Sequence, residues 1–102
     1  MPYSACVVVQ NEAFTLDVSI RSILPFVDEV VIFENGSVDS TRDIMRRLEG
    51  EFGNRVRNIF GQDNVNLAEA RNLVQQAARN EWIIWWDADF VAYGDEDGPV
   101  PF

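Results

Sequence analysis

The stretch Trp82-Ile83-Ile84-Trp85-Trp86-Asp87-Ala88-Asp89 joins five consecutive apolar residues to two closely spaced carboxylates. An unbroken apolar run of this length is typical of a strand that is buried on both faces. We therefore expect residues 82–86 to form a central strand of a parallel sheet. In an extended backbone alternate side chains lie on the same side, so Asp87 and Asp89 would point one way and Ala88 the other.

Upstream of this stretch, strand and helix patterns alternate along the chain. Short apolar runs predict strands at 3–9, 29–33 and 55–60, and apolar residues at helical spacing predict helices at 16–24, 40–52 and 67–78. Alternation with apolar strands favours a three-layer α/β/α fold around a mostly parallel sheet. We expect residues 1–93 to form one half-domain and residues 94–102 to form a flexible, acidic tail rich in glycine and proline.

The composition excludes several kinds of function. The 102 residues carry a net charge of −9, which argues against binding to nucleic acids or anionic membranes. All eight basic residues are arginine, and the absence of lysine and histidine excludes P-loop phosphate chemistry, histidine catalysis and histidine-bound zinc. The single cysteine, Cys6, is predicted to be a buried structural thiol. The sequence shows no signal peptide and no apolar stretch long enough to span a membrane, so the expected location is cytoplasmic.

Acidic side chains follow three of the four predicted strands. Glu12 follows the first strand, beside the polar residues Gln10 and Asn11. Glu34 and Asp39 follow the second strand, and Asp87 and Asp89 follow the fourth. Ligands of open parallel sheets bind beyond this edge. Because no lysine can neutralise these carboxylates, they either raise one another's pKa or bind a cation. We therefore predict a site for Mg²⁺ or Mn²⁺, which would also let an acidic protein hold a diphosphate.

Each of these features also has a purely structural interpretation. Among nine aspartates a D-x-D spacing is expected about once by chance, and Asp95-Glu96-Asp97 is a second copy. Residues 34–37 could be only a turn, Asp39 a helix cap, Glu12 a first-turn charge, Arg71 a partner of Glu34 or Glu81, and Trp82, Trp85 and Trp86 core residues. The position of Asp87 and Asp89 at a strand end favours function for that pair.

In combination the motifs resemble family-2 glycosyltransferases. The matching segments, in the family's order, are Asn11-Glu12, Glu34 to Thr41, Ala70-Arg71-Asn72 and Asp87-Ala88-Asp89. The resemblance implies a GT-A fold and a nucleotide-diphosphate sugar as donor, most often a UDP-sugar, bound with a divalent metal. It places Gln10 and Glu12 near the nucleoside, Glu34 at the base and Asp39 in the same loop as Glu34. It places Arg71 at the nucleotide and Asp87 by the ribose or sugar. Asp89, together with Asp87, would hold the metal.

Two departures from the family pattern matter. Glu34 stands where the family usually has aspartate, and Ser40 where it has glycine. The family's catalytic base lies beyond the D-x-D motif, so no residue of this sequence is assigned that role. We expect the chain to bind a donor while transferring the sugar poorly by itself.

Other classes remain as alternatives. A signalling receiver domain needs a lysine, which this sequence lacks. A nucleotidyltransferase needs a glycine-rich loop with arginine after the first strand, and no such loop is present. A non-catalytic nucleotide-binding or interaction module with the same fold stays open. Self-association through an exposed sheet edge is also expected.

Overall fold

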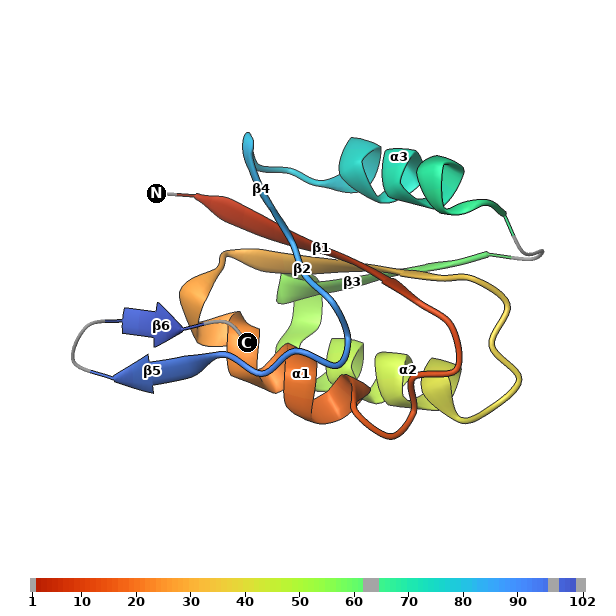
Figure 1. The fold of residues 1–102 in the computed structure, drawn as a ribbon, viewed down its shortest axis with the longest axis horizontal. Helices are drawn as coiled ribbons and strands as arrows, with labels where there is room; N and C mark the ends of the chain where they lie inside the picture. The colour runs from red at the N-terminus through yellow and green to blue at the C-terminus, as the bar shows by residue number, and fades with distance from the viewer. Residues whose placement is uncertain (1, 62–64, 96–97, 101–102) are drawn as a thin grey trace.

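A parallel sheet with the strand order β3-β2-β1-β4 forms the centre of the computed structural model, which describes residues 2–61, 65–95 and 98–100. Its strands are β1 (Tyr3–Val9), β2 (Glu29–Glu34), β3 (Val56–Phe60) and β4 (Trp82–Trp85). Helices α1 (Leu16–Ile23) and α2 (Thr41–Phe52) cover one face, and α3 (Leu67–Ala77) covers the other (Figure 1). The predicted three-layer α/β/α architecture is confirmed.

The alternation of side chains along the strands builds two apolar cores. On β1, Val7 and Val9 pack into the larger core with α1 and α2, whereas Cys6 faces the smaller core under α3. All six residues of β2 are buried, as expected of a strand with neighbours on both sides. The prediction of a buried Cys6 is confirmed, and burial, with a smaller effect from the charge of Glu29, raises the pKa of its thiol to about 11.

Strand β4 lies at the edge of the sheet, so the prediction that it is central was wrong. In the described part of the chain β4 pairs with β1 alone. Trp82 and Trp85 are 51% and 43% exposed, and only Trp86 turns into the larger core, where its Nε1 donates to Ser19 Oγ at 2.9 Å. A run of tryptophans counts as fully apolar in a sequence pattern, yet each ring can be half covered and half exposed. Self-association through this edge stays a prediction.

The helix boundaries follow the predicted signals. Pro25 lies in a short 3₁₀ turn, η1 (Leu24–Phe26), directly after α1. Gly53 ends α2 with a φ of +63° and begins a second 3₁₀ turn, η2 (Gly53–Arg55). A positive φ is easily adopted only by glycine, so the glycine explains why the helix stops there. No helix among the described residues is both long enough and apolar enough to cross a membrane.

Two short strands follow the main sheet. β5 (Tyr93–Asp95) and β6 (Gly98–Val100) pair antiparallel to form a separate two-stranded sheet. This pairing takes up part of the segment that was expected to be a flexible tail. The division into 1–93 and 94–102 stays a prediction.

A buried carboxylate ties the strands together at the amino end of the sheet. Glu29, only 3% exposed, accepts hydrogen bonds from Ser4 Oγ (2.6 Å), the Arg79 backbone N–H (2.6 Å) and Arg57 Nη1 (3.2 Å). Burial raises the pKa of Glu29, but these hydrogen bonds and the charge of Arg57 outweigh it, so the pKa lies below its usual value. One side chain therefore links β1, β2, β3 and the segment that leads into β4.

Candidate functional site

The loops that follow β1 and β2 are fastened to each other at the carboxyl edge of the sheet. The hydrogen bonds run from Asn11 N to Ser37 Oγ (2.9 Å), from Val38 N to Asn11 Oδ1 (2.8 Å), from Glu12 N to Thr41 Oγ1 (2.9 Å) and from Ala13 N to Asp39 Oδ2 (3.3 Å). Asn11 has a φ of +54°, a conformation that asparagine tolerates better than most residues. The two loops therefore form one unit, which includes the backbone of Glu12.

Asp39 shapes this unit from the start of α2. Its Oδ1 accepts from the backbone N–H of Thr41 at 2.9 Å and from the Thr41 hydroxyl, while Oδ2 holds Ala13. The hydrogen bond from the Thr41 hydroxyl is the largest influence on the pKa of Asp39 and lowers it below its usual value. The N-cap of α2 is Ser40, and Asp39 holds the turn directly before it, while the role that the resemblance implies for Asp39 stays a prediction.

Glu12, Asp87 and Asp89 bring their charges together beside this unit. Burial raises the pKa of Glu12, and the charges of Asp87, Asp89 and Asp39 raise it further. The pKa of Asp87 is raised by burial and then by a hydrogen bond and charge repulsion from Asp89. Ala88 is fully buried between the two exposed aspartates, but residues 88–89 form a turn, closed by the Phe90 N–H on the Asp87 carbonyl at 2.9 Å, where an extended backbone was expected. Within residues 2–61, 65–95 and 98–100 no arginine forms an ion pair with these acids.

Replacing Asp87 with asparagine should therefore raise the free energy of unfolding of the metal-free protein. A carboxyl group whose pKa is raised in the fold holds its proton more tightly when folded. The wild type should thus gain stability as the pH falls from that raised pKa towards the unfolded value near 3.9, and Asp87→Asn should show less of this gain. Urea unfolding in EDTA at pH 7 and pH 5 measures both effects. Asp43→Asn, at an exposed position of α2, is the control, and a less stable Asp87→Asn protein would contradict the prediction.

The donor set suits a hard cation only in part. In the portion of the chain that the structure describes, no group of three or more histidine, cysteine, aspartate or glutamate side chains could hold a metal ion. Two neighbouring carboxylates, Asp87 and Asp89, are nevertheless enough for Mg²⁺ or Mn²⁺ when substrate phosphates and water supply the other ligands. The residues present therefore fit a metal that is bound together with a diphosphate.

Glu34 does not join this group of acids. It is fully buried on the α2 side of the sheet, where its Oε2 accepts from Arg42 Nε at 2.7 Å and its Oε1 accepts from the Ser37 backbone N–H. Arg42 also donates from Nη2 to the Gly61 carbonyl at 3.0 Å. The predicted gathering of acids at one edge thus holds for Glu12, Asp39, Asp87 and Asp89, whereas Glu34 is neutralised by an arginine.

Arg42 is a residue that the sequence interpretation missed, although a signal was present. It lies in the first turn of α2, where a cation is disfavoured by the helix dipole, so an arginine there indicates a specific partner. Gly61 is equally constrained, because a Cβ at this position would lie 2.7 Å from the Glu34 carbonyl oxygen. The loops after β2 and β3 therefore meet at a contact that only glycine allows.

Asn35 was predicted to be part of a turn, but it connects two segments. Its Nδ2 donates to the Val65 carbonyl at 3.0 Å, and its Oδ1 accepts from the Val65 N–H at 2.9 Å. The Asn35 amide thus pairs with the backbone of Val65 as a neighbouring strand would. This pairing fixes the start of the segment that leads into α3.

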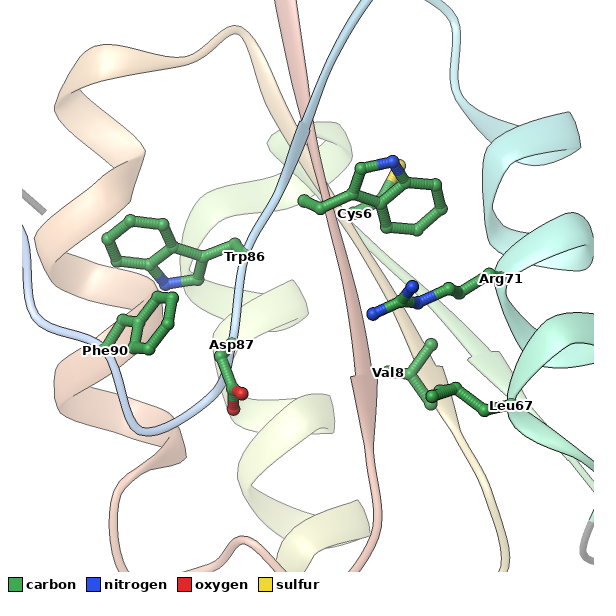
Figure 2. A pocket seen from close by; sticks show the side chains of 8 residues that line it. Cys6, Val8, Leu67, Arg71, Trp86, Asp87 and Phe90 are labelled. Carbon is green, nitrogen blue, oxygen red and sulfur yellow. The ribbon is translucent and has the colours of Figure 1, made fainter. Parts of the chain in front are cut away.

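A pocket of about 300 Å³ lies between α3 and the ends of β1 and β4 (Figure 2). Its walls are formed by Cys6, Val8, Leu67, Arg71, Trp85, Trp86, Asp87 and Phe90. Arg71 reaches from α3 towards the strands, and Asp87 lies across the pocket from it (Figure 2). The Arg71 guanidinium lies 5.5 Å from the centre of the Trp85 ring and, among the described residues, pairs with neither Glu34 nor Glu81. Gln10 is exposed at the end of β1.

The chain is similar in sequence to known glycosyltransferases. A family model described as Glycosyl transferase family 2 matches residues 4–99. A cholesterol galactosyltransferase of Borreliella burgdorferi is 28% identical over 82 residues, which cover 78% of this chain and 22% of that protein. An uncharacterized glycosyltransferase of Mycoplasma genitalium is 29% identical over 63 residues, covering 60% of this chain and 21% of that protein. The chain thus spans about a fifth of the length of the curated relatives it matches.

Solved structures share its fold. S. aureus TarS 1–349 in complex with UDP superposes with a TM-score of 0.78 at 20% identity, over 90% of this chain and 28% of that one. GalNAc-T7 with UDP, GalNAc and Mn²⁺ has a TM-score of 0.78 at 19% identity, over 90% of this chain and 19% of that one. The mannosyltransferase PcManGT from Pyrobaculum calidifontis, in complex with GDP-Man and Mn²⁺, has a TM-score of 0.78 at 23% identity, over 87% and 28%. The predicted GT-A type of fold is confirmed.

Proposed function

Because this chain belongs to glycosyl transferase family 2, we propose that the carboxyl edge of its sheet binds a nucleoside-diphosphate sugar together with a divalent metal. The observation that carries the proposal is the position of Asp87. This residue lines the pocket opposite Arg71 and lies close enough to Asp89 that, in addition to burial, the charge of Asp89 raises its pKa. A ligand that has an aromatic base at one end and a diphosphate at the other fits a pocket that continues into a carboxylate pair.

The pocket accounts for the nucleoside end of the donor. We place the base against the apolar side chains of Val8 and Leu67, where Arg71 can hydrogen-bond to the nucleotide. Asp87 then lies at the ribose or sugar, with Gln10 and Glu12 nearby at the end of β1. For Glu34, the base contact that the resemblance implies stays a prediction, because its carboxylate would first have to leave Arg42 and Ser37.

The Asp87–Asp89 pair accounts for the diphosphate end. An acidic site can hold a diphosphate when a cation lies between the two, and Asp89 with Asp87 would hold Mg²⁺ or Mn²⁺ there. When bound, the metal supplies Lewis-acid stabilisation of the departing nucleoside diphosphate. Two of the similar structures contain Mn²⁺, one with UDP and one with GDP-Man, which supports both the metal and the class of donor. We favour UDP as the nucleotide.

The proposal covers donor binding more fully than transfer. No described side chain is assigned as the base that would deprotonate an acceptor. The proposed site also does not indicate which acceptor would receive the sugar. We therefore expect the 102-residue chain to bind the nucleotide and to transfer sugar poorly by itself.

Calorimetric titration with UDP tests this function. Binding should be seen with Mn²⁺ and should weaken at least about tenfold in EDTA or in Asp89→Asn, because each change removes the link between the protein and the diphosphate. Asp43→Asn, an exposed substitution on α2, should bind UDP like the wild type. Titration with GDP under the same conditions compares the two bases. Absence of binding to both nucleotides, with and without metal, would reject the donor site in favour of a non-catalytic module.

A further inference from the structure

Arg71 has an unusual environment for a side chain in a binding pocket. Within the described residues its guanidinium forms no hydrogen bond or ion pair, in contrast to Arg42 and Arg57, whose donors bind carboxylates and carbonyls. Its five N–H donors are therefore available to a ligand. A long, exposed arginine of this kind normally samples many rotamers, and ordering it on binding weakens affinity.

Trp85 lies against the guanidinium of Arg71. The guanidinium carbon lies 5.5 Å from the centre of the indole ring, within the range of a cation–π interaction. Trp85 is on the edge strand β4, two residues before Asp87, and both residues line the pocket. The ring is 43% exposed, so its position is not explained by burial in either core.

We propose that Trp85 is a positioning residue, which holds the guanidinium of Arg71 in the pocket so that its donors face the nucleotide of the sugar donor. This inference rests on the proposed function, because it concerns how the same site binds its nucleotide. Trp85 acts through Arg71, and its aromatic face is the property that matters. A phenylalanine at this position keeps such a face, and a leucine does not.

A double-mutant cycle on UDP affinity tests the proposal, using the 102-residue chain with Mn²⁺. Trp85→Leu should weaken binding about two- to fivefold, the range expected from losing an exposed cation–π contact. Arg71→Met should weaken binding more strongly, and adding Trp85→Leu to it should cause no further loss. Trp85→Phe should restore most of the affinity. These expectations separate an effect through Arg71 from a general loss of structure.

Two controls accompany the cycle. Trp82→Leu changes the other exposed tryptophan of β4, which does not line the pocket, and should leave UDP affinity unchanged. Urea unfolding should show that Trp85→Leu remains folded under the conditions of titration. In addition, the change in tryptophan fluorescence on UDP binding should be smaller in Trp85→Phe than in Trp82→Phe, with the remaining signal coming from Trp86, which also lines the pocket.

The possible failures are distinguishable. If the wild type binds UDP but Trp85→Leu weakens binding equally with and without Arg71, Trp85 does not act through Arg71 and the inference is overturned. An unchanged affinity of Trp85→Leu would overturn it as well. If the wild type binds neither UDP nor GDP, the proposed function fails and the positioning role fails with it.

Discussion

Arg42→Met should lower the free energy of unfolding by about 3 kcal/mol, because it leaves the carboxylate of Glu34 buried without its charged partner. Glu34 is fully buried, and Arg42 is the only arginine that pairs with it among the described residues. The Arg42 side chain is 37% exposed, so water can partly replace it, which places the expected loss at the lower end of the range for broken buried pairs.

Arg46→Met is the matched control on the same helix. Arg46 pairs with Asp43 three residues before it, and both side chains are largely exposed, so its loss should change stability by less than about 1 kcal/mol. The double variant Arg42→Met/Glu34→Gln should recover part of the loss, because it removes the unpaired charge. Urea unfolding at pH 7 measures all three. If Arg42→Met were no more destabilising than Arg46→Met, the prediction would be wrong. Water would then stabilise the Glu34 carboxylate as well as Arg42 does.

Glu29→Gln should lower the free energy of unfolding by about 2 kcal/mol at pH 7. Three donors converge on the carboxylate, from Ser4, Arg57 and the backbone of Arg79. A glutamine offers one acceptor oxygen in place of two, and its N–H group would face either the Arg57 guanidinium or the Arg79 backbone N–H, neither of which can accept a hydrogen bond. Glu69→Gln, at an exposed position of α3, should have little effect.

The difference between wild type and Glu29→Gln should depend on pH in a known direction. The pKa of Glu29 is lower in the folded protein than in the unfolded chain, so the carboxylate stabilises the fold at pH values above about 4.3. This contribution is lost as the pH falls through the lowered folded value, and the two proteins should then converge in stability. Unfolding measured from pH 7 down to pH 3 would show the convergence, whereas a constant difference would mean that the charge of Glu29 contributes nothing.

The fold could be predicted from the sequence because most of its determinants are local. Pro25 and Gly53 mark the ends of helices, and the apolar run of β2 forms a strand with neighbours on both sides. The edge position of β4 could not be predicted, because the pattern Trp82 to Trp86 records apolar character and carries no information on which strand pairs beside it. Among the described residues β4 pairs with β1 alone, and this single pairing places β4 at the edge.

The candidate site was predictable where its residues follow strand ends in sequence. Glu12, Asp39, Asp87 and Asp89 come together because parallel strands end at one edge. Side-chain partners distant in sequence were not predictable in this way. The pairing of Glu34 with Arg42, rather than with the pocket, depends on which face of β2 the carboxylate occupies, and the contact of Arg71 with Trp85 depends on how α3 packs over the sheet.

The pairing of Asn35 with Val65 affects how freely this region can change in sequence. Asn35 contacts only the backbone of Val65, so the side chain at position 65 is not selected by this pairing. Position 35 is restricted, since aspartate would lose the donor to the Val65 carbonyl and glutamine would be one methylene too long. Position 65 can therefore accept any side chain that packs against the smaller core, while the Asn35 amide keeps the backbone in place where the segment leads into α3.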